Sequence, residues 1–450
     1  MSISCLLIHD VGLHIVNAMS PNEPSVLRFV NKDLCSKFGN TYILYSIYNI
    51  ISSASDGDLD VMKWAIDSGC KCENDVSIAA IRGGHNHILE WLKQNKYPID
   101  NNICSEAAKS GNILTLMWAR KNGYPWKSSV CASAAEFNHL DILLWASAEG
   151  CPWNKDVYRN AAACGNIEIL EWLLTTSCPG RECICEYAAM GCQLDILKWA
   201  REKNLPWRST YFHAANKGDV KVLKWITEND CPKCADAHIT AAMLGYLDCL
   251  KWLILNGYQL EERLFEMAAA RGNTHILEWL AEVNCPWNTR ACSSSAAHGR
   301  LDSIKWLREY NYPWDEITCS SAARWGHFDT LKWVVENGCP MDDRTCNAAA
   351  ERGSLDILKW AVDNGCSVTP LTFDNAAHFG SISVLEWLRD HDCPYNTTAC
   401  AGAAFAGHIY ILQWLKDNGY QWDFNTYISA KLAERSDVMV WLVDNGCPTS

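Results

Sequence analysis

A tryptophan recurs along this 450-residue chain at an almost constant spacing. Successive copies are 27 residues apart, except for one interval of 26 residues between Trp199 and Trp225. The fifteen copies are Trp64, Trp91, Trp118, Trp145, Trp172, Trp199, Trp225, Trp252, Trp279, Trp306, Trp333, Trp360, Trp387, Trp414 and Trp441. A fixed period of this length is typical of a solenoid, in which one unit cannot bury its apolar face alone and stacks on its neighbours. Positions within a repeat are counted below from this tryptophan.

Each repeat has the pattern of two helices joined by a glycine turn. In residues 345–366 the small pair Ala349-Ala350 precedes Gly353, and Leu358 precedes Trp360. Small side chains allow two helices to approach closely. The glycine stands at position −7 in twelve copies, where a helix commonly ends in a left-handed residue. The repeat therefore predicts a helix-turn-helix unit.

Charged residues also follow the period. Six copies have Asp at position −4 and Lys at position −1, Asp356 and Lys359 among them. Side chains three residues apart are neighbours on a helix, so we expect ion pairs within the second helix. Such exposed pairs contribute only a few tenths of a kcal/mol.

Residues 322–333, Ala-Ala-Arg-Trp-Gly-His-Phe-Asp-Thr-Leu-Lys-Trp, resemble the core of the ankyrin repeat. The resemblance covers residues 48–450 and implies an all-α, ankyrin-like solenoid of about fifteen helix-turn-helix repeats. Two departures are evident: Thr-Cys replaces the family's Thr-Pro, as at Thr318-Cys319, and the period is 27 where ankyrin has about 33. The missing residues fall where the family has its β-hairpin, so we expect tight loops with that hairpin shortened or lost.

Composition restricts the partners and the location. The formal net charge of −13 disfavours nucleic acid as the principal partner, because a phosphate-binding groove needs clustered Lys and Arg. Residues 1–20 lack a basic start and are interrupted by His9, Asp10 and His14, which is unlike a signal peptide. No apolar run reaches membrane-spanning length. We expect an intracellular, cytoplasmic monomer with no membrane contact.

The 24 cysteines follow the repeat rather than a metal or disulfide pattern. Nine occupy position +6 (Cys70, Cys151, Cys178, Cys231, Cys285, Cys339, Cys366, Cys393, Cys447), and seven occupy position −14 (Cys104, Cys131, Cys185, Cys292, Cys319, Cys346, Cys400). Tyr or Leu replaces them in other copies, so they are interpreted as small core hydrophobes. The Cys231-Pro-Lys-Cys234 pair lacks a second pair at zinc-ribbon spacing. We expect no disulfide, no metal and no cofactor.

Residues 7–38 lack the repeat and contain two short amphipathic patterns around Ser20-Pro21. This segment resembles an F-box, which docks on a Skp1-type adaptor. The resemblance implies an F-box-like domain at 1–40 before the repeat array at 41–450. It assigns adaptor binding to Val11, Ile15, Pro21, Leu27 and Val30. The alternative is a cap that shields the first repeat from water.

No enzyme motif stands outside the repeat: there is no Gly-rich phosphate loop, nucleophile elbow or His-Glu-x-x-His. The nearest pair of candidate ligands is His85 and His87, and His85 is at the ankyrin Gly-His position. We therefore expect no enzyme but a protein-protein interaction module. The two resemblances together imply a substrate receptor of a cullin-type ubiquitin ligase. The combination of an F-box-like segment with ankyrin-like repeats is similar to F-box and ankyrin proteins of giant viruses, which would place the protein in a host cell. The alternatives are a scaffold, or an effector that masks a host protein, without a ligase link.

Two sets of variable or aromatic residues are candidates for binding a partner. Position −8 of five consecutive repeats has no acidic residue, and position −9 adds further basic and aromatic side chains. This predicted target-binding stripe comprises Arg271, His298, Arg324, Trp325, Arg352 and Phe379, with His378 and Phe405 beside it. Arg and Trp are enriched in interface hot spots, whereas a solvated helix face that has drifted is the alternative. The second set is a tryptophan at position +8 in six copies, Trp314 among them, which could stack a ligand or cover the loop against the next repeat.

Overall fold

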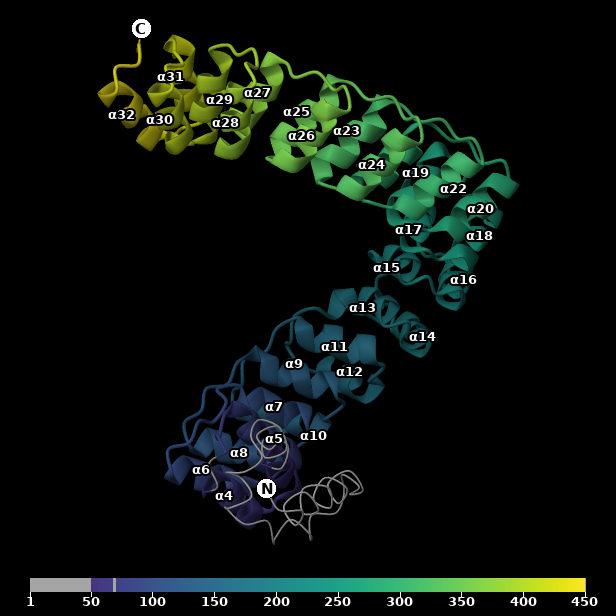
Figure 1. Ribbon diagram of the computed structural model, residues 1–450. Coiled ribbons are helices and arrows are strands. Elements are labelled where there is room, and N and C mark those ends of the chain that lie inside the picture. The colour runs from purple at the N-terminus through teal and green to yellow at the C-terminus, as the bar shows by residue number, and fades with distance from the viewer. Residues whose placement is uncertain (1–49, 68–69, 450) are drawn as a thin grey trace, which may run out of the picture. The chain divides into compact units, whose positions relative to one another are not determined.

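A computed structural model of the chain describes residues 50–67 and 70–449, and all regular structure in these residues is helical. The expected all-α solenoid of paired helices is confirmed (Figure 1). No β-strand occurs in the described part, in agreement with the expected loss of the hairpins. The expected domain border between residues 40 and 41 lies outside the described residues and stays a prediction.

The chain divides into two compact units, residues 1–210 and residues 211–450. Within each unit the helix pairs follow one another in chain order (Figure 1). The border between the units falls in the repeat that is one residue short, between Trp199 and Trp225.

In the first unit, residues 50–56 are helical and begin the described part. The first helices of the following repeats are α5 (Asn74–Gly83), α7 (Ile103–Lys109), α9 (Ser128–Glu136), α11 (Asp156–Cys164) and α13 (Ile184–Met190), the last preceded by the 3-10 turn η2 (Arg181–Cys183). The second helices are α4 (Leu59–Asp67), α6 (Asn86–Gln94), α8 (Ile113–Lys121), α10 (Leu140–Ala148), α12 (Ile167–Leu173) and α14 (Leu194–Glu202).

The second unit continues the same alternation, and α15 (Thr210–Lys217) begins at its border. Its first helices are α17 (Ala237–Leu244), α19 (Glu262–Arg271), α21 (Arg290–Ala297), α23 (Glu316–Trp325), α25 (Asp343–Arg352), α27 (Pro370–His378), α29 (Thr398–Ala406) and α31 (Phe424–Leu432). Its second helices are α16 (Val220–Glu228), α18 (Leu247–Leu255), α20 (Thr274–Glu282), α22 (Leu301–Glu309), α24 (Phe328–Glu336), α26 (Leu355–Asp363), α28 (Ile382–Asp390), α30 (Ile409–Asp417) and α32 (Ser436–Asp444).

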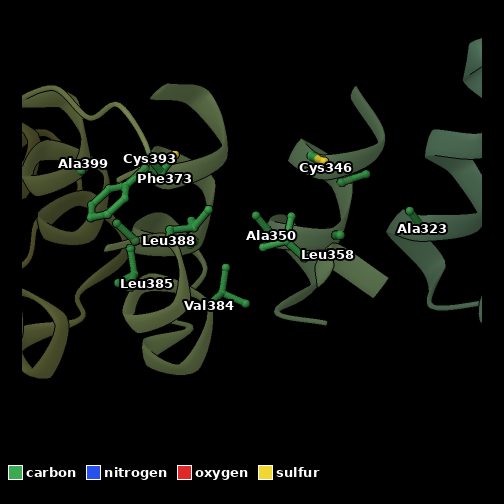
Figure 2. Close-up of a cluster of buried hydrophobic side chains, with 14 of the residues drawn as sticks. Ala323, Cys346, Ala350, Leu358, Phe373, Val384, Leu385, Leu388, Cys393 and Ala399 are labelled. Carbon is green, nitrogen blue, oxygen red and sulfur yellow. The ribbon is translucent and has the colours of Figure 1, made fainter. Parts of the chain in front are cut away.

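The core is a continuous layer between the helices of successive repeats. First helices pack on one another, as α23 does on α25, and each also packs on its own second helix. The small pair predicted to allow this approach is fully buried, as at Ala349 and Ala350. Leu358 of α26 is also fully buried and lies beside Ala350 (Figure 2). Each repeat thus completes the core of its neighbours.

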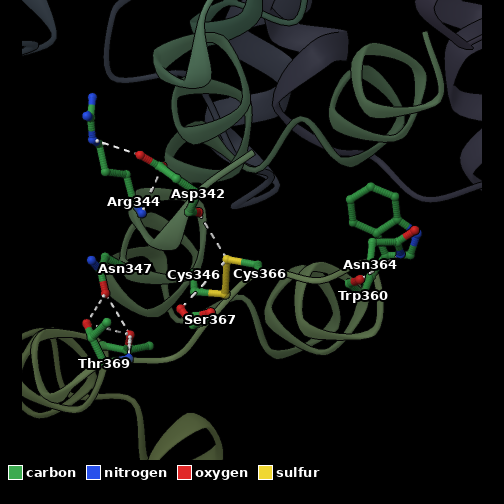
Figure 3. Close-up of a disulfide and its surroundings, with 10 residues drawn as sticks. Asp342, Arg344, Cys346, Asn347, Trp360, Asn364, Cys366, Ser367 and Thr369 are labelled. Atoms are coloured by element: carbon green, nitrogen blue, oxygen red, sulfur yellow. Dashed lines mark hydrogen bonds and ion pairs between the residues drawn. A yellow bond between two sulfur atoms is a disulfide. The ribbon is translucent and has the colours of Figure 1, made fainter. Parts of the chain in front are cut away.

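Both helix ends in a repeat have a local cause. Gly326 and Gly353 end α23 and α25 with φ of 77° and 75°, and the replacements Asn138 and Glu434 keep the left-handed backbone with φ of 62° and 54°. The second helix of the Gly353 repeat also ends in a left-handed residue, Gly365 with φ of 93°, and the asparagine at position +4 adds a side-chain cap. Asn364 Nδ2 donates to the Trp360 carbonyl at 2.8 Å (Figure 3).

The predicted Asp-Lys pairs within the second helix are mostly wrong. Among the described residues, only the Asp195-Lys198 pair of the six is within ion-pair distance, at 3.6 Å. Three of the other lysines instead lie over the tryptophan of the next repeat: Lys63 over Trp91, Lys251 over Trp279 and Lys305 over Trp333, with 5.8–6.0 Å from Nζ to the ring centroid. An ammonium is attracted to the face of an indole, so these lysines join repeats rather than stabilise one helix.

Where position −1 is glutamate, the same tryptophan is contacted differently. The Trp118 Nε1 group donates to Glu90 of the preceding repeat at 2.8 Å, and Trp199 Nε1 donates to Glu171 at 3.2 Å. In these five repeats the residue before the tryptophan therefore contacts the tryptophan of the next repeat, through the indole face or the indole N–H.

The cysteines at positions −14 and +6 are buried, as expected of core residues, except for the half-buried Cys70. Burial raises the pKa of Cys178 to about 11 and that of Cys292 to about 12, which keeps these thiols neutral. The expectation that no cysteine forms a disulfide is wrong at one pair, because the structure joins Cys346 to Cys366 (Figure 3). The reason is that positions −14 and +6 of one repeat face each other, with the Cα atoms of this pair 6.4 Å apart.

Side-chain size is coupled across this pair of positions. The neighbouring thiols of Cys151 and Cys319, together with burial, raise the pKa of Cys131 and of Cys339, respectively. Where one position is aromatic, the other is usually cysteine, and examples of such pairs are Tyr158/Cys178, Phe265/Cys285, Cys292/Tyr312, Phe373/Cys393 and Tyr427/Cys447. The positions therefore do not vary independently, because they share one space in the core.

Replacing cysteine by tyrosine at position +6 is expected to have opposite consequences in two repeats. Cys285→Tyr would add a second ring to the space that the Phe265 ring already fills. Such overpacking lowers the free energy of unfolding by about 1–3 kcal/mol. Cys339→Tyr would face Cys319, as Tyr312 faces Cys292, and should change the free energy of unfolding by less than about 1 kcal/mol. Urea unfolding followed by tryptophan fluorescence checks this prediction. Equal destabilisation by both substitutions would contradict it.

Candidate protein-binding surface

The predicted stripe lies at the C-terminal ends of consecutive first helices in the second unit. Arg271, Trp325 and Arg352 end α19, α23 and α25, while His298 and Phe379 are the residues that follow α21 and α27. All five are exposed, as is Arg324. Because neighbouring first helices pack on one another, these ends form a row. The structure thus brings the predicted stripe residues onto one surface.

Basic side chains make up one part of the row. Arg324 pairs with Glu351 of the next repeat at 2.7 Å. Arg352 has no acidic partner within ion-pair distance in the described residues, and its Nε lies 2.7 Å from the place that a Cβ on Gly326 would occupy. Arg352 therefore reaches back beside Trp325, the residue before that glycine.

Aromatic side chains make up the other part. The exposed fractions of Trp325, Phe379 and Phe405 are 56%, 51% and 47%. The His378 ring stacks on Phe405 with centroids 6.1 Å apart and touches Phe379 at 4.8 Å. The His378 ring is held by Nδ1, which lies 3.2 Å from the Gly402 carbonyl oxygen. This histidine therefore fixes the positions of two half-exposed rings.

The helix dipole explains the basic residues only in part. A cation near a helix C-terminus interacts favourably with the partial negative charge there. Arg271 and Arg352 therefore stabilise the helices that they end. Trp325, Phe379 and Phe405 gain nothing from that dipole, and large exposed rings at these two adjacent repeat positions leave apolar surface in water. The helix dipole therefore does not explain the aromatic members of the row.

Sequence reasoning missed Glu351. The absence of acidic residues was noted for position −8 alone. Glu351 is at position −9 and neutralises Arg324, which belongs to the preceding repeat. A count of charge at both positions would have found it. The unpaired cation of this part of the row is therefore Arg352.

The adaptor-binding residues predicted from the sequence, Val11, Ile15, Pro21, Leu27 and Val30, lie outside the described residues.

The two alternative ligand sites have structural roles instead. His85 Nε2 lies 2.9 Å from the Ser55 carbonyl oxygen, and His87 Nε2 lies 3.0 Å from that of Gly57, so each bridges to the preceding repeat. Other residues at the His85 position do the same, as Asn112 Nδ2 does to the Ile81 carbonyl at 2.8 Å. No group of three or more His, Cys, Asp or Glu side chains placed to hold a metal occurs in the described part of the chain.

The tryptophans at position +8 cover the loops. Trp314 meets Trp333 of the next repeat edge to face with centroids 6.2 Å apart, and Arg308 lies 4.2 Å from the Trp314 ring centroid. Trp126 is held in the same way by Trp145 at 5.7 Å and Arg120 at 4.1 Å. An indole held on both sides is a packing group between repeats.

A hollow in the first unit is lined by Cys72, Glu73, Asn74, Asp75 and Pro98. Burial raises the pKa of Cys72 to about 11, so this thiol is protonated at neutral pH and is a poor nucleophile.

The fold and the row of exposed helix ends define a helical repeat protein. Residues 239–281 match the family model described as "Ankyrin repeats (many copies)". Ankyrin repeats generally act as protein-protein interaction modules. No curated protein matches the chain in sequence. None of the described helices is long and apolar enough to cross a bilayer.

Solved structures of other helical repeat proteins are similar to the chain at low identity. The human ASB11 ankyrin repeat domain is 18% identical over 42% of this chain and 100% of that domain, with a TM-score of 0.33. The maize pentatricopeptide repeat protein PPR10 is 12% identical over 92% of this chain and 71% of its own, with a TM-score of 0.27. PPR10 in complex with an 18-nt psaJ RNA element is 11% identical over 90% and 79%, with a TM-score of 0.25.

Proposed function

We propose that this protein recruits a target protein through the row of first-helix ends in the second unit and presents it to a cullin-type ubiquitin ligase. The observation that supports target binding is the set of half-exposed rings beside an unpaired Arg352. Exposed aromatic and arginine side chains that cluster on one surface are typical of binding hot spots.

The ligase link comes from the F-box-like pattern of residues 1–40. Val11, Ile15, Leu27 and Val30 are expected to supply the apolar surface that a Skp1-type adaptor contacts, and Pro21 the turn between the two helices. A chain with these two surfaces would join a target to the ligase without chemistry of its own.

The triple substitution Arg271→Ala, Trp325→Ala and Arg352→Ala is expected to remove the principal co-purifying protein. All three side chains are exposed, so the thermal midpoint should remain nearly unchanged. Affinity purification with mass spectrometry, together with thermal unfolding, checks this result. A matched triple variant on the second helices of the same repeats, Glu278→Ala, Lys332→Ala and Lys359→Ala, should retain the partner.

The alternative is a scaffold or a masking effector that binds its target through the same surface without a ligase. Skp1-type adaptor and cullin among the co-purifying proteins would favour the receptor. A retained target with neither protein present would favour the alternative. Retention of the target in the first triple variant would place the binding surface elsewhere on the repeats.

A further inference from the structure

We infer that the partner segment bound by the second unit is an acidic stretch with a bulky apolar residue several positions away. The inference rests on the proposed function and names the chemistry of its partner. It concerns the patch formed by Arg324, Trp325, Arg352, His378, Phe379 and Phe405 on α23 to α29.

The charges of the patch favour an acidic ligand. Two acidic side chains in or beside the patch are engaged: Glu351 pairs with Arg324, and Asp374 accepts a hydrogen bond from Thr398. Arg352 has no such partner in the described residues and lies beside Trp325. A carboxylate can therefore pair with a free guanidinium here, whereas a cationic ligand would have to compete with existing ion pairs.

The rings define the second feature of the ligand. Phe379 and Phe405 are both about half exposed and share contact with His378. An apolar side chain that covers these two rings removes apolar surface from water on both sides of the contact. The ligand therefore needs a Phe- or Leu-like residue at this end of the patch.

The repeat sets the distance between the two features. Packed helices lie about 8–10 Å apart, and the Arg352 guanidinium lies beside Gly326 of the preceding repeat, so Phe379 is about two helix spacings from it and Phe405 about three. An extended chain advances about 3.3 Å per residue. An acidic residue opposite the Arg352 guanidinium and an apolar residue opposite Phe379 or Phe405 are thus about five to nine positions apart.

Single-stranded nucleic acid is the less favoured occupant. It also combines negative charge with flat rings, but it requires basic residues along its whole backbone. This protein has a net charge of −13, and Arg324 is already neutralised by Glu351.

The test uses the full-length chain and a fluorescein-labelled peptide in fluorescence anisotropy. The peptide has three central aspartates, flanked on each side by four Gly/Ser residues and a terminal Phe-Leu pair, so that it fits in either chain direction. We expect saturable binding that weakens with salt, at least tenfold weaker binding when lysines replace the aspartates, and a similar loss when serines replace the Phe-Leu pairs. No binding of the aspartate peptide up to about 0.5 mM, or equal binding of the lysine peptide, would overturn the inference.

Variants of the protein locate the site. Arg352→Glu is expected to weaken binding of the aspartate peptide about tenfold or more, and Arg352→Gln is expected to weaken it about threefold. Phe379→Ala combined with Phe405→Ala should cost about tenfold. The controls Lys359→Glu, on α26 of the same repeat, and Leu371→Ala, at the other end of α27, should change affinity less than twofold. Unchanged affinity in Arg352→Glu, or tighter binding of a labelled thymidine 20-mer than of the aspartate peptide, would also overturn the inference.

The outcome is separable from that of the proposed function. If the alanine triple variant loses its co-purifying protein while the wild-type chain does not bind the acidic peptide, the surface binds a target of different chemistry. If the peptide binds but the triple variant keeps its partner, the patch takes acidic segments and the principal target binds elsewhere.

Discussion

The Gly191→Ala substitution is expected to lower the stability of the first unit by about 3 kcal/mol, the upper end of the usual cost of overpacking. A Cβ on Gly191 would lie 1.9 Å from the Ala163 carbonyl oxygen and 2.6 Å from its carbonyl carbon. Both atoms belong to the backbone of α11, so no side chain can rotate away. Space is the cause rather than conformation, because Gly191 has a φ of −93° that any residue adopts.

Hydrogen exchange of the amides in α11 and α13, combined with urea unfolding, measures this effect. Cys164→Ala is the matched control, since Cys164 occupies the same position −8 in the preceding repeat and is exposed. The control should change stability by less than about 0.5 kcal/mol. A similarly small effect of Gly191→Ala would mean that α11 and α13 approach less closely than the structure shows.

The double substitution Ile15→Asp and Val30→Asp is expected to abolish binding of a Skp1-type adaptor. Both residues belong to the apolar surface that the F-box resemblance assigns to the adaptor, and a buried carboxylate without a partner costs several kcal/mol. Loss of 4 kcal/mol would weaken a micromolar complex about a thousandfold. Binding would then disappear from calorimetry at protein concentrations of about 50 µM.

A matched variant adds the same two charges away from the predicted apolar positions. Asn17→Asp with Ser25→Asp should retain binding within a few-fold, because neither residue shares a helical face with Ile15 or Val30. Absence of adaptor binding by the wild-type chain would favour the interpretation of residues 1–40 as a cap. Binding that survives Ile15→Asp with Val30→Asp would move the adaptor surface to other residues.

Contacts inside one repeat could be predicted from the sequence, and contacts between repeats mostly could not. The small pair Ala349-Ala350, the turn at Gly353 and the buried Leu358 all follow from local spacing, which is the same in every copy. Lys305 was assigned to Asp302 by the same local rule, but its ammonium lies over Trp333. The i,i+3 rule describes an isolated helix and contains no information about the neighbouring indole.

The exposure of the candidate surface residues could be predicted from their positions in the repeat, but the pairing of their charges could not. The variability of positions −8 and −9 indicated Arg324, Trp325, Arg352 and Phe379, and the structure places all four at exposed helix ends. The neutralisation of Arg324 by Glu351 and the unpaired state of Arg352 depend on which helix each side chain reaches.

By itself, the sequence determined the period, the pairing of helices, the turn residues and the burial of the cysteines, because each of these arises from a local pattern repeated at fixed spacing. The tertiary structure alone decided that Cys346 faces Cys366, that Lys305 contacts Trp333 rather than Asp302, and that Arg352 lies beside Trp325 without an acidic partner among the described residues. The physical reason is that these contacts join residues 20 or more positions apart, whose distance is set by helix stacking rather than by the helix period.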